Sequence, residues 1–158
     1  MNAIIYNENL LWANTLNLWC KHYGFNRVNL IHDKNALVTY ANDNISDIDL
    51  IIVGYYGNDG KDNTDIIKKL RNISSDFLII AVSADFVTDM ELLDTKAMKD
   101  AIFAGANRAS IKEIKSLKAI IDQHIALRTH KDYELMKKDP EQYFKNINNI
   151  VTTLGIKK

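Results

Sequence analysis

The sequence predicts an α/β fold, in which a doubly wound sheet of five parallel strands is followed by an extra C-terminal helix. Short apolar runs, typical of strands buried on both faces, recur along the chain. Between them lie segments of about ten residues or more, whose apolar residues repeat at helical spacing. Because strands alternate with helices, we expect right-handed crossovers and a parallel sheet with helices on both faces.

The clearest predicted strand is Asp49–Val53, which leads directly into Gly54. The other strands are equally short and consist mainly of isoleucine, valine, leucine and alanine. They are expected at residues 3–6, 28–31, 77–82 and 109–111, of which the last is the weakest.

Helical spacing predicts the segments that cover this sheet. Gly24 follows the first of them, where a helix end takes a left-handed residue, and Asp33 is a predicted N-cap of the second. The helices are expected at residues 10–23, 33–41 and 63–73, within 94–105, and from 112 onward.

A further helix is predicted to begin at Asp139, an N-cap residue that is followed by Pro140 at the first helical position and by Gln142. An apolar stripe continues from it, formed by Tyr143, Ile147, Ile150, Val151 and Leu154. Such a stripe is not stable alone in water, so it either packs on its own domain or forms a dimer seam or a partner-docking surface. We therefore divide the chain into a domain at 1–130 and a helical extension at 131–158.

Composition excludes several classes of protein. The chain has 158 residues and a formal net charge of zero, so neither nucleic acid nor a membrane surface is an expected partner. A single cysteine, Cys20, excludes an internal disulfide framework and a multi-thiolate metal site, and we assign it to the core. Without a signal peptide or an apolar run long enough to span a bilayer, the sequence indicates a cytoplasmic protein.

Ligands of such sheets gather outside the carboxyl ends of the strands. In this chain the residues expected there are Asn7–Asn9, Gly54–Gly60, Ser83–Asp85 and Lys112. The glycines of the second segment match neither the P-loop nor the dinucleotide-binding pattern. The four histidines show no metal-ligand spacing with acids.

At these strand ends the chain resembles the receiver domain of two-component response regulators. The segment 104–112, Ala-Gly-Ala-Asn-Arg-Ala-Ser-Ile-Lys, is similar to the turn that leads to the family's lysine. Val82–Ala84 resembles its fourth strand, which ends in a switching hydroxyl residue, and Asp49–Val53 resembles the strand that delivers the phosphoacceptor. The resemblance covers roughly residues 2–128 and implies a flavodoxin-like, or receiver-like, fold and a role in signalling.

The family's chemistry is phosphoryl transfer to an aspartate, with Mg²⁺ held by acids and with a lysine and a hydroxyl on the phosphoryl oxygens. Carried over by position, the acceptor falls on Gly54 and the paired acids on Asn7 and Glu8. The hydroxyl and the lysine fall on Ser83 and Lys112. The resemblance therefore implies a degenerate phosphoacceptor pocket, a pseudo-receiver.

The conformational reporter of the family is missing as well. Its aromatic switch residue falls on Ala109, and the proline after the lysine falls on Glu113. We predict no catalytic residue, no metal site and no cofactor-binding residue.

Simpler interpretations exist for the same residues. Lys112 is also explained as a surface lysine, Ser83 as a hydroxyl bonded to local backbone, and Glu8 as the partner of Lys112 in an ion pair. Tyr55 and Tyr56 either cap a pocket or a partner's apolar side chain, or fill the volume of the lost metal site.

These observations predict a pseudo-receiver that is not an enzyme. It acts in signalling independently of phosphorylation, through protein–protein interaction, with a homodimer through the C-terminal helices as one form of that interaction. The first alternative is a small-molecule sensor that uses the strand-end cleft. The second is a flavodoxin-like enzyme or flavin carrier, although Asn7-Glu8-Asn9-Leu10 is not a hydroxyl-rich phosphate loop.

Overall fold

The structure, a computed structural model, describes the backbone of residues 1–86 and 96–142, and their side chains except at 128–137. Its sheet has five parallel strands in the order β2-β1-β3-β4-β5 within these residues. The strands are β1 (Asn2–Tyr6), β2 (Arg27–Ile31), β3 (Leu50–Gly54), β4 (Leu78–Ser83) and β5 (Arg108–Ile111). The predicted fold class is confirmed.

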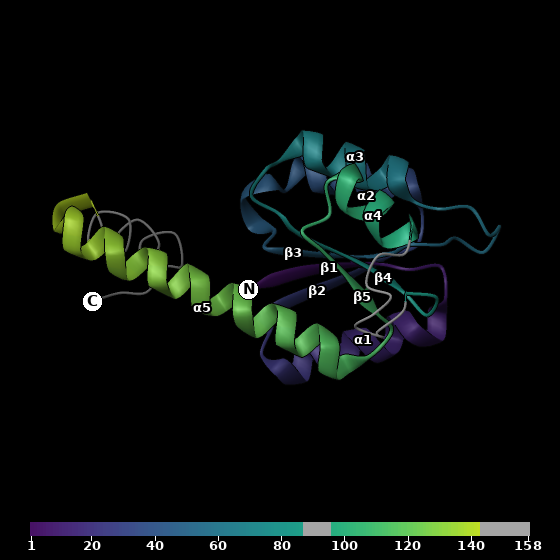
Figure 1. The fold of residues 1–158 in the computed structure, drawn as a ribbon, viewed down its shortest axis with the longest axis horizontal. Coiled ribbons are helices and arrows are strands. Elements are labelled where there is room, and N and C mark those ends of the chain that lie inside the picture. Colours follow the sequence, from purple (N-terminus) through teal and green to yellow (C-terminus); the bar gives the residue numbers. More distant parts are fainter. Residues whose placement is uncertain (87–95, 143–158) are drawn as a thin grey trace. The chain divides into compact units, whose positions relative to one another are not determined.

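Each strand except the last is followed by a helix that leads to the next strand. The helices are α1 (Leu10–Tyr23), α2 (Lys34–Asp43), α3 (Thr64–Ile73), α4 (Lys96–Ala104) and α5 (Ile114–Lys138). A short 3₁₀ helix, η1 (Ile45–Asp47), was not predicted. Helices α2, α3 and α4 lie on one side of the sheet, and α1 lies on the other (Figure 1).

The chain divides into two compact units, residues 1–116 and 117–158. Helix α5 passes through position 130 without a break. The domain boundary expected at residue 130 therefore stays a prediction. The fold and the site described below belong to the first unit.

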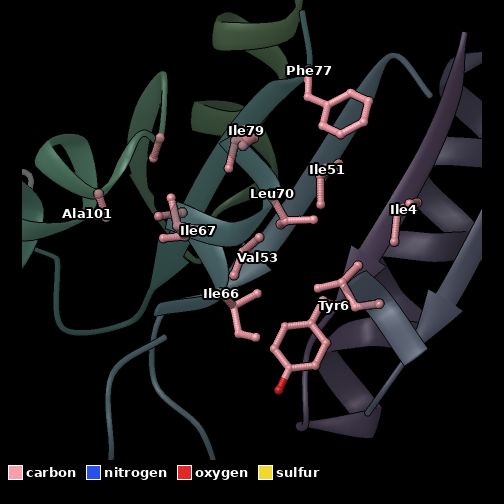
Figure 2. Close-up of a cluster of buried hydrophobic side chains, with 14 of the residues drawn as sticks. Ile4, Tyr6, Ile51, Val53, Ile66, Ile67, Leu70, Phe77, Ile79 and Ala101 are labelled. Carbon is pink, nitrogen blue, oxygen red and sulfur yellow. The ribbon is translucent and has the colours of Figure 1, made fainter. Parts of the chain in front are cut away.

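The main core lies between the sheet and helices α2, α3 and α4. Alternate residues of the strands face it, and β3 is buried along its whole length. In Figure 2 the side chains of Ile66, Ile67 and Leu70 of α3 lie against those of the central strands. Each large aliphatic side chain buried there contributes about 1.5–3 kcal/mol.

Helix α1 covers the opposite face of the sheet, formed by the strand residues that alternate with those of the main core. Ala13, Leu16 and Cys20 of α1 are buried there. Burial raises the pKa of the Cys20 thiol to about 12, so this sulfur stays protonated at neutral pH. The assignment of Cys20 to the core is confirmed.

Several helix ends follow the predicted capping chemistry. The Asp33 carboxylate accepts a hydrogen bond from the backbone N–H of Ala36 at 2.8 Å, and Gly24 closes α1 with a φ of 107°. The Asp139 carboxylate accepts from the N–H of Gln142 at 3.0 Å, which confirms the predicted helix start. The stripe from Tyr143 to Leu154 lies outside the described residues.

Arg71, at the end of α3, binds several segments at the end of the sheet opposite the candidate site. Its guanidinium donates hydrogen bonds of 2.7–3.1 Å to backbone carbonyls and to one side-chain oxygen. The acceptors are the carbonyls of Ser74, Ser75, Phe77 and Gly105 and the Asn107 Oδ1 atom. The α3–β4 and α4–β5 connections are thereby held by one side chain.

Gly105 makes this contact possible. Its φ is 117°, and an added Cβ atom would lie 2.8 Å from the Arg71 Cβ atom. Two residues later, Asn107 pairs with Ile79 through both its backbone N–H and its side-chain oxygen, each at 2.8 Å. The turn before β5 therefore requires glycine both for its backbone angle and for its packing.

We predict that Gly105→Ala destabilises the protein more than Gly24→Ala does. Both glycines have a φ above 100°, but an added Cβ atom at Gly24 meets nothing within 4 Å. The backbone penalty, about 1–2 kcal/mol, is shared, so the difference of about 1–3 kcal/mol reports the Arg71 contact. Urea unfolding of both variants measures it. Equal losses would show that Arg71 moves aside without cost.

Candidate functional site

The strand register brings the predicted pocket residues to one edge of the sheet. Tyr6 pairs with Val53, so Asn7 follows β1 beside Gly54 on β3. Gly54 pairs with Val82, and Ser83 pairs with Ile111. Lys112 follows β5 directly. Four neighbouring strands thus end in Asn7, Gly54, Ser83 and Lys112.

Asn7 is almost completely buried, with 4% of its surface exposed. Its Oδ1 atom accepts a hydrogen bond from the backbone N–H of Asn9 at 2.9 Å, and its carbonyl lies 2.8 Å from the Nδ1 atom of His32. The Nδ2 group has no hydrogen-bond partner among the described residues. The amide is therefore fixed through its oxygen and has an unpaired donor.

Gly54 lies against this amide. A Cβ atom at Gly54 would be 3.0 Å from the Asn7 Nδ2 atom and 3.1 Å from its Cγ atom. The Gly54 carbonyl accepts a hydrogen bond of 2.7 Å from the buried side chain of Asn63. Asn63 therefore holds the strand end and does not cap α3 with its side chain. A side chain at position 54 would have to displace Asn7.

Glu8 is directed to the loop between β3 and α3. Its carboxylate accepts hydrogen bonds from the Tyr6 hydroxyl at 3.1 Å and from the backbone N–H of Asn58. Burial and the bond to this carboxylate raise the pKa of Tyr6 well above its usual value. An added Cβ atom at Gly57 would lie 3.0 Å from the Glu8 Oε1 atom, so glycine admits the carboxylate. In the described part of the chain, no ion pair joins Glu8 to Lys112.

The two tyrosines after β3 have different environments. Tyr55 is 2% exposed and packs against Phe86, with ring centroids 5.1 Å apart. Burial raises the pKa of Tyr55 to about 12. Tyr56 is 41% exposed and lies edge-on to Tyr55. Tyr55 therefore belongs to the main core, and Tyr56 is the exposed ring of this pair.

Ser83 and Lys112 lie on the far side of Gly54 from Asn7. Ser83 is 4% exposed, and its Oγ atom accepts a hydrogen bond of 3.1 Å from the N–H of Asp85, as its simpler interpretation predicts. Lys112 is half-buried and forms no hydrogen bond or ion pair with the residues described. Ala109 packs against the main core from β5.

The donors at this edge do not fit a Mg²⁺ site. Mg²⁺ favours an octahedral set of oxygens that includes one or two carboxylates and waters. Gly54 supplies no side chain, the Asn7 oxygen is bonded to Asn9, and both Glu8 oxygens are engaged. The described side chains also contain no cluster of three or more histidine, cysteine, aspartate or glutamate residues suited to a metal ion.

A second feature is a groove between α4 and β5, with a volume of about 410 Å³. Phe103 is 85% exposed there, and Ile102 is also exposed. The lining residues are Met98, Lys99, Ile102, Phe103, Asn107, Arg108 and Ala109. Sequence reasoning did not single out Ile102 or Phe103, although two adjacent large apolar residues near the end of a short helix are a detectable signal.

No protein-family profile matches the chain, and no curated protein matches it. In the described residues, no helix is both long and apolar enough to cross a bilayer. Similarity is found among solved structures.

One such structure is the CheX–CheY complex with BeF₃ and magnesium from Borrelia burgdorferi, with 16% identity, a TM-score of 0.63, and coverage of 80% of this chain and 88% of that one. Another is the receiver domain of the histidine kinase CKI1 from Arabidopsis thaliana with Mg²⁺ and BeF₃⁻. It has 15% identity, a TM-score of 0.63, and coverage of 77% and 87%, respectively. A putative pilus assembly-related protein from Burkholderia pseudomallei has 17% identity, a TM-score of 0.60, and coverage of 80% and 90%. Structural neighbours of this chain thus include receiver domains of response regulators and histidine kinases, and at these identities the similarity establishes the fold.

The contact between Asn7 and Gly54 predicts energetic coupling. Gly54→Ala should destabilise the protein because the buried Asn7 amide, held by Asn9, cannot yield freely. In an Asn7→Ala background the same change should cost less. Urea unfolding of the two single variants and the double variant should give a coupling of about 0.5–3 kcal/mol. Additive losses would mean that the amide relaxes away from position 54.

Proposed function

We propose that this chain is a phosphorylation-independent, receiver-like signalling module that acts by binding proteins. The observation that carries the proposal is the close contact between Gly54 and the Asn7 side chain. Gly54, at the position of the phosphoacceptor, carries no nucleophile. The place where its side chain would lie is next to the Asn7 amide. Aspartyl phosphate cannot form on a residue without a carboxylate.

The rest of the edge supports the same proposal. Glu8, the one acid at the positions of the metal-binding pair, fastens the β3–α3 loop through Asn58. Ala109 lacks the aromatic ring that reports phosphorylation in the receiver family. A conformational switch driven by aspartyl phosphate would therefore lack its nucleophile, its metal and its reporter.

The α4–β5 groove is the surface that we assign to a protein partner. Large exposed aromatic side chains beside a groove are frequent anchors of protein interfaces. Phe103 and Ile102 provide the apolar centre, and Arg108 adds a positive charge at the edge. Partner binding at this groove needs no chemistry at Gly54.

The C-terminal extension, 131–158, is a second proposed contact region. Its helix starts at Asp139, and the apolar stripe Tyr143, Ile147, Ile150, Val151 and Leu154 follows in the sequence. We propose that these residues form the seam of a homodimer. Analytical ultracentrifugation of the wild type and of Ile150→Asp tests this. If the stripe forms the dimer seam, the wild type should have the mass of a dimer and the variant that of a monomer.

We predict that acetyl phosphate with Mg²⁺ leaves the intact mass of the protein unchanged. Gly54→Asp should also acquire little or no phosphoryl group, because the new side chain meets Asn7 and Glu8 is the only nearby acid of the former pair. Mass spectrometry of both proteins after incubation measures this. A stable phosphoryl adduct on the wild type would refute phosphorylation independence, and Asp59 would then be the first residue to map.

We predict that Phe103→Glu abolishes capture of the partner protein from an extract of the native host. A buried charge in the groove would lose the apolar contact and carry a desolvation cost. Circular dichroism and urea unfolding should show a folded variant, since Phe103 is 85% exposed.

Leu18→Glu is the matched control, because Leu18 is an exposed apolar residue of α1. It should leave capture intact. Loss of capture in both variants, or in neither, would remove the groove as the partner surface.

A further inference from the structure

We infer that the α4–β5 groove is a binding site for a small amphiphilic carboxylate, a molecule with an apolar body and one anionic end. The inference goes beyond the proposed contact with a protein partner and does not depend on it. It starts from two properties of the lining residues: an apolar wall that is open to solvent, and polar side chains that offer hydrogen-bond donors and positive charge.

Helix α4 provides most of the apolar wall. Its side chains line the groove in two rows, each with a spacing of four residues, formed by Met98 and Ile102 and by Lys99 and Phe103. Phe103 is 85% exposed and Ile102 is 43% exposed. Contiguous apolar surface of this kind beside a groove is typical of a binding site. The apolar body of a ligand would cover it.

Ala109 leaves space for such a body. Its side chain is half-buried and lines the groove from β5. The groove has a volume of about 410 Å³, which lies within the range of small-molecule sites. A bulky side chain at position 109 would fill part of this volume. Alanine, where the receiver family has an aromatic residue, therefore keeps the groove open.

Asn107 lines the groove with a fixed amide. Its Oδ1 atom accepts two hydrogen bonds, from the Ile79 N–H at 2.8 Å and from the Arg71 Nη2 group at 2.7 Å. The oxygen is thus engaged, whereas the Nδ2 group donates no hydrogen bond in the described part of the chain. The side chain therefore offers a donor to a ligand, and its acceptor is already used.

Arg108 and Lys99 make the groove positive. The Arg108 Nη1 group donates to the carbonyl of Asn107 at 2.8 Å, which positions the guanidinium beside the start of β5. No described carboxylate forms an ion pair with Arg108, and none is among the residues that line the groove. Because a guanidinium can bond a carboxylate through two parallel N–H groups, Arg108 is the group that we assign to the anionic end.

The two properties together select the class of ligand. Inorganic anions and sugar phosphates would leave the apolar wall uncovered, and a neutral apolar molecule would not use the charge of Arg108. A carboxylate with a short alkyl or aryl body uses both. Since such a ligand would cover Phe103, it would compete with a protein that binds the same groove.

Nuclear magnetic resonance of the full-length, ¹⁵N-labelled protein tests the inference. The probe is 4-phenylbutyrate, titrated at constant ionic strength with sodium chloride as the compensating salt. The backbone amides of Phe103 and Ala109 should shift saturably, with a Kd on the order of 1 mM. The neutral probe 4-phenylbutan-1-ol, of similar size, should bind about tenfold more weakly, because it lacks the charge-assisted bond to the guanidinium.

Arg108→Gln should weaken binding of 4-phenylbutyrate by about the same factor, because it removes the charge and keeps a polar side chain. Arg27→Gln serves as the charge control. It removes the arginine at the start of the other edge strand, β2, where the guanidinium lies 3.9 Å from Asp47. This variant should bind the probe as the wild type does.

Ala109→Phe tests the volume of the groove. The added ring should abolish saturable binding, whereas Ala36→Phe, which adds the same ring at an exposed alanine of α2, should leave binding unchanged. Urea unfolding shows whether each variant is folded. Arg108 is exposed, so the comparison of Arg108→Gln with its control decides the inference even if Ala109→Phe does not fold.

The inference is overturned if 4-phenylbutyrate causes no saturable shift at the groove amides, or if the alcohol binds as tightly as the carboxylate. It is also overturned if Arg108→Gln binds as tightly as Arg27→Gln, or if a folded Ala109→Phe binds as tightly as Ala36→Phe. None of these results bears on the capture of a protein partner, which Phe103→Glu tests separately.

Discussion

Parallel pairing of the four strands β1, β3, β4 and β5 is the constraint on which the candidate site depends. Because Tyr6 lies beside Val53 and Gly54 beside Val82, the residue that follows β1 must stand next to the last residue of β3. Asn7 and Gly54 are thus neighbours through the backbone before any side-chain contact forms. Their side chains then complement each other, one an amide and the other a hydrogen atom. The effect of a substitution at one of these positions therefore depends on the residue at the other.

The fold was predictable because its signals are local. The strands are continuous apolar runs, and Asp33, Gly24 and Asp139 are caps whose chemistry acts within a few residues. The contacts of Arg71 were not predictable in this way. Its acceptors lie up to 36 residues away in the sequence, and no local sequence pattern indicates that the end of α3 contacts the turn before β5. The glycine of that turn was noticed through a family resemblance, whereas the reason for it emerges from its contact with Arg71.

The candidate site was also predictable only in part. The positions of its residues could be predicted, because the carboxyl ends of parallel strands lie at one edge of the sheet. The hydrogen-bond partners of each side chain could not be predicted. The sequence left Glu8 with Lys112 as one option, but the carboxylate bonds with Tyr6 and Asn58 instead. Tyr55 and Tyr56 are identical in chemistry and adjacent in sequence, and only packing against Phe86 separates the buried ring from the exposed one.

The way in which Arg71 is bonded has a consequence for how this chain can vary. In the α3–β4 connection the guanidinium contacts carbonyl oxygens of Ser74, Ser75 and Phe77, and every amino acid carries such an oxygen. Residue identity in this loop is therefore weakly constrained by the contact, while its length and path are strongly constrained. As far as Arg71 is concerned, substitutions at Ser75 should be tolerated among natural variants, whereas a single insertion or deletion there would shift the acceptors out of reach.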